Sequence, residues 1–266
     1  MSTLPSTGSS LPAIDGYAAA LFEAERTRRT IAPFSPDHPE LGEPEAYAIQ
    51  AAGLALRGAP RIGYKLGYTS AAMRAQMNID HPNFGVLTAD MRIDPTSDQV
   101  CAAELIHPMV EPEIALLLGR RIEGTQHDRN SVWRHVDAVL PALEIVDTRY
   151  HEYKFAIVDN IADNSSSARF VTGAPLSLQR CDDLRLVGVL LSCDGRATDH
   201  GIGANAMGDP LLALAWLANF LGAREVPLEE GALILTGGLT RAHPAIAGQV
   251  MMGEFSQLGV AKACFA

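Results

Sequence analysis

Two glutamates that are two residues apart, in the segment Glu111-Pro112-Glu113, are the first candidates for chemistry in this sequence. On a β-strand, residues two apart point to the same face, so their carboxylates lie side by side. Burying two neighbouring carboxylates is costly unless a cation or a proton intervenes. Pro112 cannot donate a hydrogen bond to a neighbouring strand, which predicts a sheet edge or a bulge here. An isolated pair of this kind is more often a solvated edge than a functional site.

A third acid, Glu144, lies in the largely apolar segment ALEIVD. Three converging carboxylates provide the hard oxygen ligands that Mg²⁺ or Mn²⁺ prefers. Such a set leaves octahedral positions for water and substrate. The three acids together therefore predict a divalent-metal site made by Glu111, Glu113 and Glu144.

Polar residues elsewhere in apolar surroundings are weaker candidates. Lys65 lies between glycines in the segment GYKLG, where its amine must either reach solvent or pair with an anion. A substrate carboxylate or the glutamate cluster would serve as that anion. The segment ADNSSSARF, residues 162–170, predicts a loop rich in local side-chain hydrogen bonds. Its hydroxyl groups would suit a bound carboxylate, but the same residues are also typical of an ordinary turn.

Other kinds of site lack their motifs. The eight histidines form no HxH or HxxxH pair, which disfavours a zinc site. The sequence has no GxSxG, and GIGANAMG has the wrong glycine spacing for a dinucleotide fingerprint. The four cysteines form no CxxC and are interpreted as free thiols in a reducing compartment.

The composition also excludes several classes of partner. The 266 residues carry a formal net charge of -10, without the basic footprint of a nucleic-acid-binding protein. No apolar run approaches the length of a membrane span. The N-terminus has no basic segment followed by an apolar one, so we predict no signal peptide and a cytoplasmic protein.

The elements that must position these residues fall into two regions. Residues 1–60 are expected to form an N-terminal helical region, and residues 61–266 a β-rich catalytic domain. Helical patterns are found at 15–29, 43–57, 131–140 and 211–221. The other segments of the second region have strand character, with hairpin turns at Asp194-Gly195 and Gly259. Strands without regular βαβ alternation predict an α+β fold, a mixed β-sandwich or roll with N-terminal helices.

Seven motifs resemble those of a known family, in the same order. They are GYKLGYTS, HPNFGVLTADM, EPEIALLLG, ALEIVDTRY, DNIADNSSSARFVTG, ALAWLANFLG and LILTGGLT. This order resembles the 2-keto-4-pentenoate hydratase and 4-oxalocrotonate decarboxylase family, which belongs to the fumarylacetoacetate hydrolase superfamily. The resemblance extends from about residue 15 to the C-terminus.

The resemblance implies a fold, a site and an assembly. The fold would be the mixed β-sandwich or roll of that superfamily, and Mg²⁺ would bind Glu111, Glu113 and Glu144. Lys65 would contact the 2-oxo acid end of the substrate, and Ser166 would line the same pocket. Relatives form homo-oligomers that serve aromatic meta-cleavage pathways, and hydratases and decarboxylases of this type can associate with one another.

The reaction is left open by the flanking residues. Asn83 occupies a position where the hydratases commonly have an aspartate, and an amide cannot act as a carboxylate base. Asp80, three residues earlier, could take over that role. The run TRYHEYKF instead resembles the decarboxylases.

Three activities are therefore expected. The first is hydration of 2-hydroxypenta-2,4-dienoate to 4-hydroxy-2-oxopentanoate. The alternative is decarboxylation of 4-oxalocrotonate. A third is a C–C hydrolase of the acylpyruvase type, which is disfavoured because the N-terminal region shows no His–Glu pair to activate water.

Overall fold

The computed structural model describes residues 14–266 except 72–73, 75–78, 80 and 95. Asp80, one of the residues predicted to take part in proton chemistry, lies outside the described residues. So does most of the N-terminal segment on which the signal-peptide prediction rests. Among the described residues, no helix is long and apolar enough to cross a membrane.

Helices and strands are mixed along the chain. The α-helices among the described residues are α1 (Ile14–Thr27), α2 (Glu43–Arg57), α4 (Arg129–Trp133), α5 (Ile157–Ala162) and α6 (Pro210–Gly222). The strands are β1 (Arg61–Gly67), β2 (Asn83–Thr88), β3 (Gln99–Val100), β4 (Met109–Leu118), β5 (Val136–Val146), β6 (Ser167–Thr172), β7 (Leu176–Ser177), β8 (Gly188–Cys193), β9 (Arg196–Ile202), β10 (Leu233–Leu235), β11 (His243–Pro244), β12 (Val250–Phe255) and β13 (Gly259–Phe265). The predicted α+β class is confirmed.

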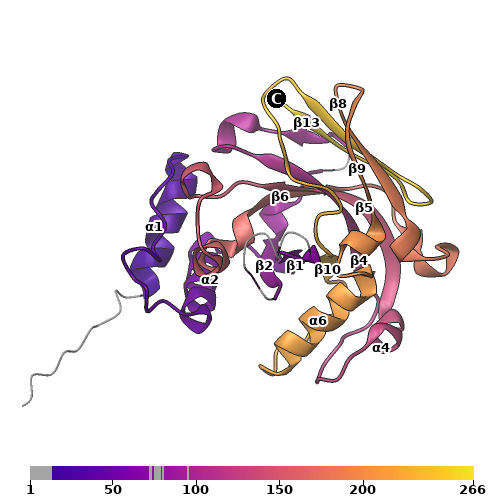
Figure 1. Ribbon diagram of the computed structural model, residues 1–266, viewed down its shortest axis with the longest axis horizontal. Coiled ribbons are helices and arrows are strands. Elements are labelled where there is room, and N and C mark those ends of the chain that lie inside the picture. Colours follow the sequence, from indigo (N-terminus) through magenta and orange to yellow (C-terminus); the bar gives the residue numbers. More distant parts are fainter. Residues whose placement is uncertain (1–13, 72–73, 75–78, 80, 95) are drawn as a thin grey trace, which may run out of the picture.

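The larger of the two sheets is strongly curved. Its strand order is β2-β1-β10-β4-β5-β6, with β11 added on β4 and β7 on β5. Only the β1–β10 pair is parallel among the described strands of this sheet. In Figure 1 this sheet curves through the centre of the molecule, with α1 and α2 at one side and α6 beneath it.

A second sheet covers the outer face of the first. Its order is β3-β13-β12-β8-β9, and it is drawn above β5 and β6 in Figure 1. Buried apolar side chains fill the space between the sheets, with Ile114, Leu143 and Ile145 on one side and Met251 and Phe255 on the other. Because side chains alternate along a strand, the opposite face of β4 and β5 is left for the three glutamates.

The second N-terminal helix begins and ends where its local signals place it. Pro44 occupies the first turn of α2, and Gly58 ends that helix in a left-handed conformation with φ 67°. α1 and α2 bury apolar faces against each other and against Tyr150 and Ile161. The helices at 15–29 and 43–57 are thereby confirmed, and they share a core with later residues of the chain.

The helix expected at 131–140 is wrong. α4 ends at Trp133, and β5 begins at Val136 and pairs with β4 over its whole length. Strand pairing in a central position outweighs the helical pattern of this short segment. The sequence pattern also missed α5, whose first turn is held by Asp159, which accepts a hydrogen bond from the Ala156 amide.

The position of Pro112 corrects another expectation. β4 is a central strand, not an edge, since it pairs with β5 on one side and with β10 and β11 on the other. However, β10 reaches only as far as Ala115, and β11 begins at Val110. Pro112 lies in the gap between them, where its missing N–H leaves no strand unpaired.

We expect the packing between the two sheets to stabilise the whole site. The variant Leu143→Ala removes a fully buried side chain and should lower the free energy of unfolding by about 2–5 kcal/mol. The control Leu190→Ala alters a strand residue that is 42% exposed, and should cost less than about 1 kcal/mol. Denaturant unfolding compares the two. Equal losses would contradict this account of the core.

Candidate metal centre

The three glutamates meet on the concave face of the larger sheet. Glu111 and Glu144 are directly opposite each other in the β4–β5 register, and Glu113 is two residues further along β4. One carboxylate oxygen from each lies within 4.8 Å of the others. The convergence predicted from the sequence is therefore present, although the spacing of the residues along the sequence does not link Glu144 to the other two.

The carboxylates are buried with unused acceptor capacity. Glu113 and Glu144 are fully buried, whereas Glu111 is partly exposed. Glu113 Oε1 and Glu144 Oε1 accept no hydrogen bond, and Glu113 Oε2 accepts one from the Gly237 amide at 2.7 Å. Buried carboxylate oxygens without donors are the arrangement that a bound cation satisfies, so these residues fit Mg²⁺ or Mn²⁺.

Lys65 supplies the only positive side chain in direct ion-pair contact with this cluster among the described residues. Its ammonium is 3.1 Å from Glu144 Oε2 and donates to the Ser165 carbonyl at 3.0 Å. Three carboxylates and one ammonium leave a formal charge of −2. A divalent cation would neutralise that charge.

The pKa values record the same excess of negative charge. Burial, together with repulsion from Glu144, raises the pKa of Glu111 to about 7, although Lys65 opposes this. Burial and the repulsion from Glu144 raise the pKa of Glu113 well above its usual range. Burial disfavours the charged form of Lys65, but the attraction of the three carboxylates outweighs it and raises the Lys65 pKa.

The loop that receives Lys65 has a rare backbone conformation. Asn164, Ser165 and Ser166 all have left-handed backbones, with φ of 50°, 53° and 58°. Residues with a Cβ pay about 1–2 kcal/mol each for this conformation. The turn directs the Ser165 carbonyl toward Lys65, which a regular strand would not do.

A chain of neutral polar side chains continues from this loop. The Ser165 hydroxyl donates to Asn83 Oδ1 at 3.1 Å, and Asn83 Nδ2 donates to Asn160 Oδ1 at 2.8 Å. Asn160 Nδ2 then donates to the Ser166 hydroxyl at 3.0 Å. Asn83 and Ser166 are thus buried beside the site and hold each other through Asn160. Their predicted roles in catalysis and substrate binding stay predictions.

Sequence reasoning missed three residues of the site. The Ser165 carbonyl accepts a hydrogen bond from the Lys65 ammonium, and Asn160 links Asn83 to Ser166. Gly237 follows β10 with φ 108°, where a Cβ would lie 2.0 Å from Thr69 Oγ1. The motifs DNIADNSSS and TGG contain these residues. Their contacts depend on the left-handed turn and on the way the loops cross, which the sequence motifs do not specify.

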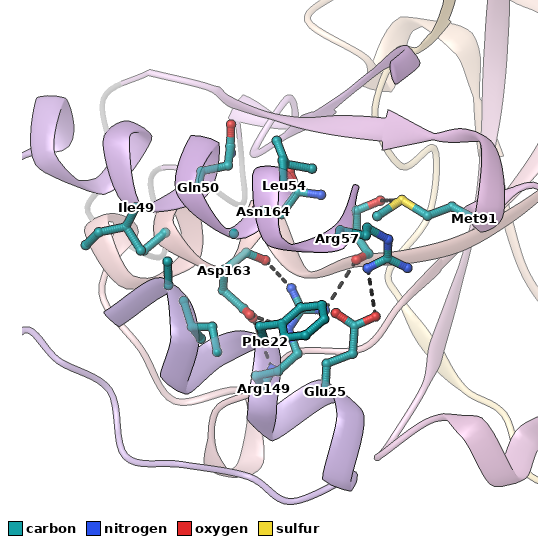
Figure 2. A pocket seen from close by; sticks show the side chains of 15 residues that line it. Phe22, Glu25, Ile49, Gln50, Leu54, Arg57, Met91, Arg149, Asp163 and Asn164 are labelled. Carbon is teal, nitrogen blue, oxygen red and sulfur yellow. Dashed lines mark hydrogen bonds and ion pairs between the residues drawn. The ribbon is translucent and has the colours of Figure 1, made fainter. Parts of the chain in front are cut away.

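A separate cavity lies behind the left-handed loop, between α1, α2 and the start of β6 (Figure 2). It is lined by Phe22, Glu25, Arg57, Arg149 and Asp163, among others, and by none of the three glutamates. Its charged side chains are already paired with one another. The clustered carboxylates, not this cavity, have the unused ligand atoms.

The chain matches known proteins over most of its length. The profile of the family "Fumarylacetoacetate (FAA) hydrolase C-terminal" matches residues 61–266. The chain is 38% identical to the 2-hydroxyhexa-2,4-dienoate hydratase of Comamonas testosteroni, over 88% of this chain and 90% of that protein. It is 35% identical to the 4-oxalocrotonate decarboxylase of Pseudomonas putida, over 91% of this chain and 92% of that protein.

A solved structure extends the likeness to the fold. The 4-oxalocrotonate decarboxylase from Pseudomonas putida G7, complexed with magnesium and adipate, aligns with a TM-score of 0.91 at 33% identity. The alignment covers 97% of this chain and 99% of that chain. The predicted resemblance and the predicted fold class are both confirmed, and relatives with either activity match at similar identity.

We expect divalent cations to stabilise the protein more at pH 8 than at pH 6. Without a cation, the folded-state pKa of Glu111 is raised to about 7, so its contribution to stability is present at low pH and is lost as pH rises through about 7. A cation takes over from the proton, and its binding should therefore raise the melting temperature most where Glu111 is ionised. Thermal unfolding with Mg²⁺ or Mn²⁺ at the two pH values measures the difference.

Matched variants identify the site of this effect. Glu111→Gln should reduce the cation-dependent shift, whereas Glu254→Gln, which alters an exposed residue of β12, should leave it unchanged. A shift that is equal at both pH values, or unaffected by Glu111→Gln, would show that the cation binds elsewhere.

Proposed function

Because the chain belongs to the fumarylacetoacetate hydrolase family, and within it to the hydratases and decarboxylases, we propose that it adds water to 2-hydroxypenta-2,4-dienoate to give 4-hydroxy-2-oxopentanoate. The observation that carries this proposal is the cluster of Glu111, Glu113 and Glu144 next to the buried ammonium of Lys65. A cation held by three acids, with a lysine beside it, suits a substrate that has a carboxylate next to a 2-oxo or enol oxygen.

The proposed chemistry depends on stabilising an enolate. Mg²⁺, which Glu111, Glu113 and Glu144 would hold, supplies the positive charge that favours the enolate form of a 2-oxo acid. Lys65 adds a second, fixed positive charge whose ammonium is held by Glu144 and by the Ser165 carbonyl. This preorganised charge needs no rearrangement when negative charge develops on the substrate.

The reaction itself requires two proton movements. The dienol loses its O–H proton and gains a proton at C5, which gives 2-oxopent-3-enoate. The C3=C4 double bond of this product is conjugated to its oxo group. One water molecule then adds OH at C4 and H at C3, which gives 4-hydroxy-2-oxopentanoate. Asn83 holds Ser165 and Asn160 through its amide and has no carboxylate to accept a proton. Lys65 and Asp80 are therefore the proposed proton carriers.

The alternative is decarboxylation of 4-oxalocrotonate, and the amide at position 83 favours it. Breaking the bond to the distal carboxylate releases CO₂, and the electron pair stays on the substrate as a dienolate. No water has to be deprotonated, so a site without a carboxylate at this position can still perform the step. After protonation on oxygen, the product is 2-hydroxypenta-2,4-dienoate, the substrate of the hydration. A relative of the same fold was solved with magnesium and a dicarboxylate, adipate.

A direct assay separates the two reactions. We expect 2-hydroxypenta-2,4-dienoate to lose its ultraviolet absorbance in the presence of protein and Mg²⁺, and excess EDTA to stop the loss. Mass spectrometry should find one added water. 4-Oxalocrotonate should release little CO₂ over the uncatalysed rate. Rapid CO₂ release without hydration would reject the hydratase in favour of the decarboxylase, and turnover in excess EDTA would reject the metal-dependent mechanism.

The role of Lys65 has its own test. Lys65→Met should lower kcat/KM by about 10²-fold or more, because a preorganised charge is lost from the reacting centre. Mn²⁺ affinity should stay the same or increase, because a competing positive charge beside Glu144 has been removed. The control Lys262→Met breaks only a surface ion pair with Asp98 and should retain full activity. Full activity of Lys65→Met would make Lys65 a structural residue.

A further inference from the structure

One buried arginine connects both ends of the left-handed loop. Arg149 follows β5, is 4% exposed and donates from every nitrogen of its guanidinium. Nε donates to the Asp163 carboxylate and Nη2 to the Asp163 carbonyl. Nη1 donates to the Ser167 carbonyl at 3.3 Å and to the Asp147 carbonyl at 3.0 Å.

The acceptors of Arg149 directly flank the strained residues. Asp163 precedes Asn164 and Ser167 follows Ser166, so one planar group binds the carbonyls on both sides of the left-handed turn. The Asp163 carboxylate also accepts from the Thr148 hydroxyl and from the Arg149 amide. The turn is therefore held at both of its ends by hydrogen bonds from Arg149.

We propose that Arg149 is a positioning residue for the reaction, which acts by holding the Asn164–Ser166 turn so that the Ser165 carbonyl fixes the Lys65 ammonium. This inference rests on the proposed function only for its catalytic readout. Arg149 itself contacts none of the three glutamates through any ion pair or hydrogen bond between described residues. Its effect must pass through the loop.

The N-terminal helices support the same arginine. Glu25 of α1 lines the same cavity as Arg149 and Asp163 (Figure 2). Glu25 accepts from Arg57 of α2 at 2.8 Å, and Arg57 also donates to Asp90 at 2.7 Å. The attraction of Arg149, ahead of that of Arg57, holds the pKa of Glu25 below its usual range despite burial. A line of alternating charges thus runs from the helices to the loop.

A purely structural role and a positioning role give different results. A structural role would lower stability and the folded fraction, and the remaining folded enzyme would react normally. A positioning role would lower kcat in folded enzyme, while the cation site formed by β4 and β5 would keep its affinity. A lysine cannot reach three carbonyls and a carboxylate in the fixed fork of a guanidinium, so Arg149→Lys keeps the charge and removes the geometry.

The experiment compares Arg149→Lys with Arg169→Lys in the full chain. Arg169 lies in β6, bonds its neighbour's carbonyl and pairs with Glu104 at the surface, so its variant is a matched control. For Arg149→Lys we expect kcat to fall at least tenfold, KM to change less than threefold and Mn²⁺ affinity to change less than twofold. Arg169→Lys should match the parent protein in all three. A parent-like kcat in folded Arg149→Lys would overturn the proposal.

A chemical rescue and an exchange measurement complete the test. In Arg149→Ala the cavity would extend into the space of the lost guanidinium, so millimolar guanidinium should raise kcat in this variant and not in Arg169→Ala. In Arg149→Lys, the amides of the loop should exchange hydrogen faster than in the parent protein, while those of β4 and β5 should not. If the parent protein turned over no 2-oxo acid, the proposed function would fail, and hydrogen exchange would still decide whether Arg149 holds the loop. Unchanged exchange in the loop would overturn its positioning role.

Discussion

The repulsion between three buried carboxylates is the interaction on which the rest of the site depends. Glu111, Glu113 and Glu144 carry more negative charge than Lys65 can neutralise, and burial strengthens their repulsion. Without a cation, burial and this repulsion raise the pKa values of Glu111 and Glu113. A divalent cation would neutralise the repulsion and bind the carboxylate oxygens that have no donor. The cluster therefore suits cation binding and does not by itself stabilise the fold.

Glycines and a left-handed turn make room for this cluster. A Cβ on Gly238 would lie 3.0 Å from Glu111 Oε1, and one on Gly85 would lie 2.5 Å from the Asn164 carbonyl. Backbone therefore approaches the carboxylates where a side chain would otherwise fill the site. The surrounding hydrogen bonds, including those of Arg149, offset the conformational free energy of the left-handed residues. Such strain is common where a scaffold positions reacting groups.

The same centre suits two reactions because both need a stabilised dienolate. Hydration and decarboxylation of these substrates differ in how the proton moves and in what leaves, not in where the negative charge develops. In the proposed mechanism the glutamates and Lys65 carry the shared chemistry, and the surrounding residues decide between the two reactions. Asn83 is the clearest of these, because its amide is committed to Ser165 and Asn160 and has no carboxylate.

Local patterns in the sequence determined the helices α1, α2 and α6, the main strands and the shared face of Glu111 and Glu113, because caps and two-residue periodicity act over a few residues. Only the tertiary structure decided that Glu144 lies opposite Glu111, since strand register joins distant segments. It also showed that β5, not a helix, occupies most of residues 131–140. Pro112 lies in a gap between two neighbouring strands and not at a sheet edge, and Ser165 contacts Lys65. Each of these depends on pairing or backbone conformation that neighbouring residues do not specify.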